Sequence, residues 1–304
     1  MKTTPARPLA IASAVVAGGF MAVQARVNSG LAAELGSGFL AAFISFSIGL
    51  ALIAIVSLPR KKFRQDLGNV VRSASAGAFP WWMLFSGALG GFFVLTQGLV
   101  AGITGVALFS LGVVTGQTLS ALLIDGRGLF GLDRRTLSLN RLIGSLLALV
   151  GLVLASNPTL AGVDLVLFVP LIAGVGIGLQ DAINSRVSKI SGSAAVATFF
   201  NFLAGTLFLF FVLLTSPIPE VDLLSISPIL YIGGLVGVSF ILIRVLVLPV
   251  IGSLATGLSL LAGQLSVSLA LDYLVPVTMR EITAWTLSGL LLVFAGATFA
   301  MIRR

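Results

Sequence analysis

The chain has 304 residues, of which 58% are hydrophobic and only 9% are charged, and its mean hydropathy is +1.14. Soluble domains carry about 25% charged residues. A chain this apolar has too little polar surface to fold as a soluble globule, so the lipid bilayer must be its solvent. Cysteine and histidine are both absent, which excludes disulfides, thiol chemistry, Cys/His metal sites and a histidine base.

Ten apolar segments are long enough to cross the hydrocarbon core of a bilayer, which takes about 20 helical residues. The first begins at Leu9, and we interpret it as a membrane span because no convincing cleavage site follows it, as it would in a signal peptide. Connections are mostly short, so no attached soluble domain is predicted. The predicted spans are 9–28, 38–58, 80–100, 104–125, 139–156, 164–184, 193–215, 228–248, 251–273 and 283–302.

Lysine and arginine are sorted between the two ends of the predicted bundle. With the N-terminus in the cytoplasm, all 18 basic residues except Arg26 and Arg280 lie on the cytoplasmic side. Basic loops stay in the cytoplasm, so both termini are predicted to be cytoplasmic. The net charge of +8 therefore indicates no nucleic-acid partner. The basic run 60–64 is interpreted as a topology signal that contacts lipid headgroups.

The second half of the chain repeats the first. A shift of 156 residues aligns spans 1 and 2 with spans 6 and 7, and a shift of 147 residues aligns spans 3 and 4 with spans 8 and 9. The aligned identities include Gln24 with Gln180, Asn28 with Asn184, Gly36-Ser37 with Gly192-Ser193, Gly116-Gln117 with Gly263-Gln264, and Asp125 with Asp272. The smaller second shift reflects a shorter loop before span 8.

Each half contains five spans, and because five is odd the second half enters the bilayer upside down. We predict an all-α polytopic membrane protein of ten transmembrane helices. It consists of an N-terminal five-helix repeat, residues 1–157, and a C-terminal inverted five-helix repeat, residues 158–304. Inverted repeats are typical of secondary transporters, whose site lies near the bilayer midplane between the halves.

Several motifs occur in a fixed order. They are Gln-x-x-x-Asn after a glycine-rich span 1, Gly-Ser and Ala-x-Phe-x-x-Phe-x-x-Gly in span 2, and Gly-Gln followed by an aspartate in span 4. This order resembles the drug/metabolite transporter superfamily, and within it the YdcZ-like family in its fused ten-helix form. The resemblance implies a bacterial inner-membrane protein that moves small metabolites or drug-like solutes by alternating access.

The related small multidrug resistance proteins depend on a glutamate in the middle of helix 1. The middle of span 1, from Ala14 to Met21, contains no glutamate, which argues against proton-coupled cation antiport of that kind. The resemblance also implies that spans 5 and 10, which carry few polar groups, are peripheral or form a homodimer contact.

Two glutamines are predicted near the bilayer midplane. Gln117 precedes Asp125 by eight residues, and Gln264 stands at the equivalent position of the other half. At about 1.5 Å per residue, each lies about 12 Å from its end of the bundle, and the ends are opposite because the halves are inverted. We predict this pair as a central substrate-binding site. The alternative is a hydrogen bond that only joins the two helices.

Two further polar pairs lie nearer the ends of their spans. Gln24 and Asn28 are four residues apart and therefore share one helix face, as do Gln180 and Asn184. We predict that these pairs contact substrate as an outer and an inner gate. The alternative is that they cap helices or add polarity at the interface.

Arg244 aligns with Gln97 in the repeat, and both are candidate substrate-binding residues. An arginine fork suits carboxylate or phosphate, so Arg244 is predicted to anchor an anionic group of the substrate, or else to extend to the membrane surface. Asp181 is predicted to pair with Arg186 or Lys189. Asp125 and Asp272 lie at opposite faces and are predicted to end their helices.

The sequence contains no nucleotide-binding loop and no metal-ligand cluster, so no enzyme activity and no cofactor is predicted. The repeat favours a secondary transporter, with the lipid bilayer and a small-molecule substrate as its partners. A channel usually has a row of like polar residues along one path, whereas here the polar residues are sparse and paired. A channel or a lipid flippase remains the alternative, followed by an enzyme or a structural assembly factor.

Overall fold

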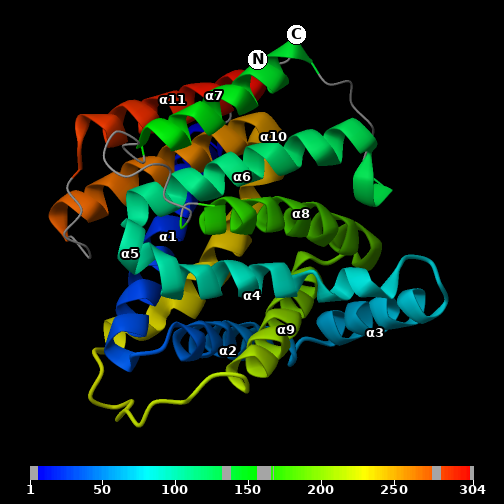
Figure 1. Ribbon diagram of the computed structural model, residues 1–304. Coiled ribbons are helices and arrows are strands. Elements are labelled where there is room, and N and C mark those ends of the chain that lie inside the picture. The colour runs from blue at the N-terminus through cyan, green and yellow to red at the C-terminus, as the bar shows by residue number, and fades with distance from the viewer. Residues whose placement is uncertain (1–5, 132–137, 156–165, 167, 276–281, 302–304) are drawn as a thin grey trace.

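The computed structural model describes residues 6–131, 138–155, 166, 168–275 and 282–301, and the regular secondary structure in them is helical (Figure 1). Seven helices are long and apolar enough to cross a membrane, and three shorter apolar helices accompany them. The described part of the chain thus contains the ten apolar segments that the sequence predicts, and the fold class is an all-α polytopic membrane protein.

The elements of the first half are α1 (Ala6–Leu35), α2 (Gly38–Ser57), α3 (Lys61–Ser75), η1 (Trp81–Phe85), α4 (Gly87–Thr96), η2 (Gln97–Ala101), α5 (Gly102–Thr104), α6 (Val106–Arg127), η3 (Leu129–Gly131) and α7 (Leu139–Ala155). Those of the second half are α8 (Phe168–Ser191), α9 (Ala194–Leu213), η5 (Pro228–Ile232), α10 (Gly233–Leu274) and α11 (Ala284–Met301). The predicted boundary between Asn157 and Pro158 lies outside the described residues.

The aligned Gly-Ser pairs form the same turn in both halves. Gly36 and Gly192 adopt left-handed φ angles of +63° and +65°, which glycine reaches without steric cost at the end of a helix. The next residue then starts a new helix. The Ser37 hydroxyl accepts a hydrogen bond from the Leu40 N–H at 3.2 Å, and Ser193 accepts one from Val196 at 3.4 Å. Each pair therefore sets a tight turn between two spans.

Helix α3 is amphipathic and is not among the ten predicted spans. Phe63 and Val70 are buried, and Leu67 and Ala74 are partly buried on the same face. This spacing is that of a surface helix. The buried face packs against α8 and α9, and the Phe63 and Phe199 rings meet with centroids 5.8 Å apart. The basic run 60–64 therefore continues into a helix that covers one end of the bundle.

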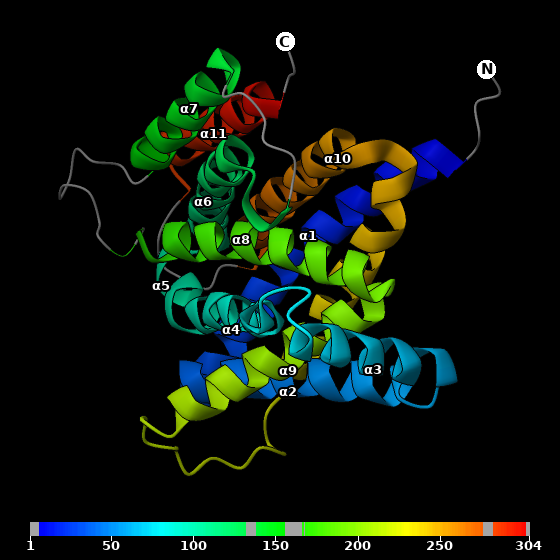
Figure 2. The same cartoon turned by 90° about the vertical axis from the view of Figure 1, so that its right-hand side faces the viewer.

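Helix α10 combines the predicted spans 8 and 9. Its 42 residues would extend about 63 Å if straight, twice the thickness of a bilayer core of about 30 Å. Its two limbs contact α1 in opposite directions. The antiparallel neighbours are Asn28 with Gly233 and Gln24 with Gly237, and the parallel neighbours are Val15 with Gly263 and Gly19 with Val267. The chain therefore reverses between the limbs, as expected from the predicted break between spans 8 and 9, and Figure 2 shows this sharp bend beside the start of α1.

The two halves interlock. Helix α1 packs between the two limbs of α10, and α8 packs in the same manner on α4 and α6 of the first half. At the centre, α2 and α9 cross antiparallel, with the Phe46 and Phe202 rings 5.1 Å apart. Gly49 lies against Phe202, and the repeat-equivalent Gly205 lies against Phe46. Equivalent positions thus exchange contacts, as expected for inverted repeats.

Helices α7 and α11 pack on each other at the edge of the bundle (Figure 1). A methyl group added at Gly289 would lie 2.3 Å from the Gly151 carbonyl oxygen, and one added at Gly296 would lie 2.6 Å from that of Gly144. Such close approach needs glycine on both helices. The small residues of these peripheral spans therefore join two helices of the same chain.

Candidate functional site

A cavity of about 270 Å³ lies among α1, α2, α4, α8, α9 and α10, so both halves contribute to its wall. Small-molecule sites measure about 300–1,000 Å³, and this cavity therefore suits a small solute. The lining residues are Met21, Gln24, Phe46, Gly90, Phe93, Val94, Ile177, Gln180, Asp181, Asn184, Ser185, Ser188, Lys189, Ala194, Ala197, Thr198, Asn201, Phe202, Gly237, Phe240, Ile241 and Arg244.

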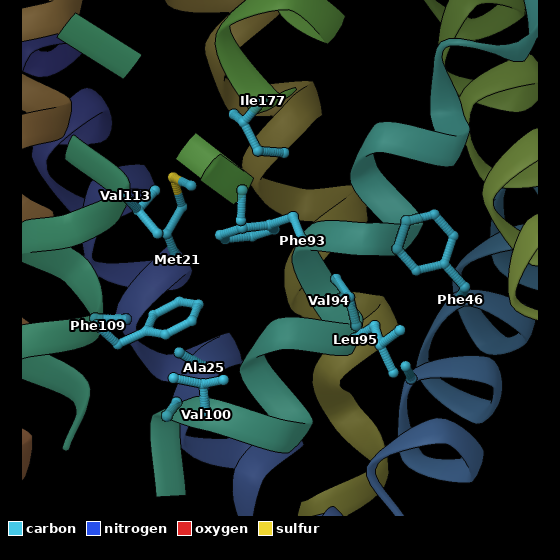
Figure 3. Close-up of a cluster of buried hydrophobic side chains, with 14 of the residues drawn as sticks. Met21, Ala25, Phe46, Phe93, Val94, Leu95, Val100, Phe109, Val113 and Ile177 are labelled. Carbon is cyan, nitrogen blue, oxygen red and sulfur yellow. The ribbon is translucent and has the colours of Figure 1, made fainter. Parts of the chain in front are cut away.

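One part of the cavity wall is apolar. Met21, Phe93 and Ile177 come from three different helices and converge in the main hydrophobic core (Figure 3). Phe46 and Phe202 from the α2–α9 crossing and Phe240 from α10 add aromatic surface. This part of the wall can hold the apolar body of a solute.

A group of amides connects α8 and α9 beside the cavity. We call Gln180, Asn184, Asn201 and Ser86 the α8 cluster. The amide groups of Gln180 and Asn184 both donate to the Asn201 Oδ1, the latter at 3.0 Å, and the Ser86 hydroxyl donates to the Asn184 Oδ1 at 3.0 Å. The Gln180 Oε1 is buried and has no hydrogen-bond partner among the described residues.

A second polar group lies mostly in the other half and includes the repeat equivalents of Gln180, Asn184 and Ser86. We call Gln24, Asn28, Gln97 and Gly233 the α1 cluster. The Asn28 Nδ2 donates to the Gln97 Oε1 at 2.6 Å, and the Gln24 Nε2 donates to the Gly233 carbonyl at 3.0 Å. Gln97 begins the π-helical turn η2, a distortion common at functional sites.

The two clusters differ in their access to the cavity. Asn28 and Gln97 are fully buried, and of the α1 cluster only Gln24 lines the cavity. In the α8 cluster, Gln180, Asn184 and Asn201 all line it, and the lining continues to the exposed Lys189 near the end of α8. The cavity is therefore closed beyond the α1 cluster and reaches the surface at the end of the bundle where α3 packs.

Arg244 contributes a charged group to the cavity wall. Its Nη1 lies 2.5 Å from the Asp181 Oδ2, and the two side chains are 32% and 30% exposed. The guanidinium also lies 6.0 Å from the centre of the Phe240 ring. Asp181 was predicted to pair within α8, with Arg186 or Lys189, and that prediction is wrong: Asp181 pairs with Arg244 on the first limb of α10 instead.

The predicted central pair does not line the cavity. Gln117 lies on α6 at its contact with α8, where its carbonyl is close to Gly178. Gln264 is buried on α10, next to Gly263, which contacts α1. Both side chains are described and no hydrogen bond connects them. Their role in substrate binding stays a prediction.

Asn201, Ser86 and Asp181 are cavity or cluster residues that the sequence analysis does not assign to the site. Asn201 could have been found from the sequence, since it is a lone amide within the apolar segment Thr198–Gly205. It also aligns with another polar residue, Ser45, in the repeat. Ser86 could not have been found in this way, because its contact with Asn184 depends on how α4 packs against α8.

Asp272 joins the two halves. Its carboxylate accepts hydrogen bonds from the Val106 and Ala107 N–H groups at 2.8 and 2.7 Å. These N–H groups begin α6 and have no partner within the helix. Asp272, predicted to end its own helix, thus also caps a helix of the other half. The side chain of Asp125 lies outside the described part of the chain.

The sequence model of a family described as "Putative inner membrane exporter, YdcZ" matches residues 9–154 and again residues 165–299. No curated protein matches the chain. The two matches cover most of the chain and correspond to its two halves.

Proposed function

The chain belongs to the YdcZ family, described as "Putative inner membrane exporter", and from this premise we propose that it exports a small metabolite or drug-like solute across the bacterial inner membrane. It acts as a secondary transporter by alternating access, with the cavity between the halves as the binding site. The observation that carries the proposal is that repeat-equivalent amides have different surroundings: Asn28 is fully buried in its contact with Gln97, whereas its equivalent Asn184 lines the cavity.

Alternating access requires two conformations that exchange the closed and open ends. In inverted repeats, the outward-open conformation arises when each half adopts the arrangement that the other half has in the inward-open conformation. In that conformation the Asn28–Gln97 contact is separated, and Asn184 approaches Arg244, the residue equivalent to Gln97. Buried atoms without partners among the described residues, such as the Asn28 Oδ1 and Gln97 Nε2, support this view, because an incompletely paired cluster separates at lower cost.

The charge distribution orients the transporter. The cavity reaches the surface at the end that carries α3 and Lys189, which the positive-inside rule assigns to the cytoplasm. The solute would therefore enter from the cytoplasm in this conformation, as export requires.

A counterflow assay in proteoliposomes tests the function. We choose four probes with one phenyl body, to suit the aromatic wall: phenylacetate, phenylacetamide, phenethylamine and L-phenylalanine. We expect saturable exchange of at least one probe above that of protein-free vesicles. Gln180→Ala should reduce the rate about tenfold, equivalent to about 1.4 kcal/mol. Gln65→Ala, the same change on the exposed face of α3, should leave it unchanged.

The alternatives give different results in the same vesicles. A channel gives flux that does not saturate, and a flippase moves labelled phospholipid while the four probes stay in place. Either result contradicts the proposal. The variants Gln117→Ala and Gln264→Ala belong in the same assay. Loss of exchange in these two but not in Gln180→Ala would favour the central pair predicted from sequence over the cavity.

A further inference from the structure

We propose that the charged end of the cavity is a carboxylate-binding subsite, so that the transported solute is a small amphipathic organic anion. Arg244 and Lys189 bind its carboxylate, and the aromatic part of the wall holds its apolar body. This inference rests on the proposed function and specifies its substrate class.

The charges are not required by the fold. The charged residues that line the cavity are Asp181, Lys189 and Arg244. The equivalent positions of the other half hold Ala25, Ala33 and Gln97, none of which is charged. Charged side chains inside a membrane protein are costly and usually serve function. Their presence in one half alone therefore points to a ligand and not to packing.

The balance of these charges favours an anion. Two cations and one carboxylate leave the subsite with one excess positive charge. Lys189 is exposed and forms no ion pair with any described residue. Arg244 contacts Asp181 through its Nη1 atom, which faces the Asp181 Oδ2, and a guanidinium has five N–H donors. Donors therefore remain for a second carboxylate, which Arg binds well in a forked geometry.

The geometry keeps Arg244 accessible and in place. About one third of its side chain is exposed, so a solute in the cavity can reach the guanidinium. Phe240 lies beneath it at 6.0 Å, a distance at which a ring face attracts a cation. Asp181 also contacts the guanidinium, through the Nη1 atom. A carboxylate approaching from the cavity would bind next to Asp181 and, being of like charge, would weaken the Asp181–Arg244 contact.

Binding to the purified full-length protein in neutral detergent tests the subsite, with thermal unfolding as the measurement. Phenylacetate should stabilise the protein more than phenylacetamide, which has the same shape without the charge. Arg244→Gln should weaken phenylacetate binding at least about tenfold and leave phenylacetamide unchanged. Glutamine is chosen because the fold accommodates it at the equivalent position, Gln97. The second variant, Arg244→Lys, retains the charge and should still bind phenylacetate more tightly than phenylacetamide.

Two further variants sharpen the test. Asp181→Asn removes the competing carboxylate and should leave phenylacetate binding equal or tighter. Arg72→Gln removes an arginine from the exposed face of α3 and should change nothing. If phenethylamine or L-phenylalanine binds more tightly than phenylacetate and Asp181→Asn weakens that binding, the solute is a cation or zwitterion and the proposal is wrong. Tighter binding of a short-chain phosphatidic acid than of phenylacetate would assign the subsite to lipid phosphate and also overturn it.

Failure of the subsite and failure of the transport function are distinguishable. Equal binding of phenylacetate and phenylacetamide, or binding of neither, contradicts the anion subsite. Saturable counterflow of any probe in the same preparation would still support transport. Conversely, anion-selective binding without saturable flux supports the subsite and contradicts the transporter.

Discussion

Asp272 shows how one side chain stabilises the contact between the halves. Its carboxylate caps the first turn of α6 from the end of α10. A negative charge at a helix N-terminus also interacts favourably with the helix dipole. The repeat predicts that Asp272 has a counterpart in Asp125, but a sequence alignment cannot identify the helix that the carboxylate caps.

We expect Asp272→Asn to destabilise the protein by about 1–2 kcal/mol, since the amide retains one acceptor oxygen but loses the charge. Thermal unfolding in detergent measures the effect. Glu34→Gln, the same loss of charge at an exposed position near the end of α1, is the control and should be neutral. Equal unfolding temperatures for the two variants would mean that the cap contributes little.

At the scale of elements, the sequence predicted helices well wherever an apolar run was long enough to cross a bilayer. The Gly-Ser turns after α1 and α8 follow from the repeated Gly36-Ser37 and Gly192-Ser193. Helix α3 was missed because its apolar residues occupy one face only, and a search for continuous apolar runs does not detect them. The reversal within α10 corresponds to the predicted break between spans 8 and 9, although helical geometry continues through it.

The contact between α7 and α11 gives a prediction for a pair of elements. A Cβ atom at Gly151 would lie 2.8 Å from the Gly289 carbonyl oxygen, so Gly151→Leu should separate the helices and destabilise the protein by about 1–3 kcal/mol. Gly68→Leu on α3 is the matched control, since no neighbouring atom lies within 4 Å of its added Cβ. If Gly151→Leu changed the oligomeric state without lowering thermal stability, this face would be a homodimer contact.

At the scale of the whole molecule, the interlocked halves place equivalent residues in different surroundings. Ser185 lines the cavity, whereas its equivalent Ser29 is only 3% exposed. Two copies of one structural unit thus present one site to the cavity and keep the other closed. This asymmetry is the basis of the proposed alternating access.

Cysteine labelling tests this asymmetry, and the chain contains no native cysteine that would react. We expect Ser185→Cys to react with a membrane-impermeant maleimide from the cytoplasmic side and Ser29→Cys to be protected. Under turnover with a transported probe, Ser29→Cys should become reactive from the outside while Ser185→Cys is increasingly protected. Simultaneous labelling of both positions, independent of solute, would indicate a channel. Labelling of Ser185→Cys from the outside would reverse the predicted topology.

The candidate site was predictable only in part. The pairs Gln24/Asn28 and Gln180/Asn184 and the residue Arg244 were found from the repeat and from the cost of polar groups in a membrane, and most of them line or adjoin the cavity. Gln117 and Gln264 were placed at the midplane by counting residues. Counting gives depth along a helix, but it does not give the direction in which a side chain points or the helix that lies opposite.

The sequence alone determined the membrane environment, the ten helices and the inverted repeat, because hydrophobicity, helix length and the distribution of basic residues act locally along the chain. The tertiary structure decided that the halves interlock, that Arg244 pairs with Asp181, and that Asn28 is buried while its equivalent Asn184 lines a cavity. These features depend on helix packing between segments more than 60 residues apart in sequence, such as Arg244 with Asp181 and Asn28 with Gln97. No local pattern encodes them.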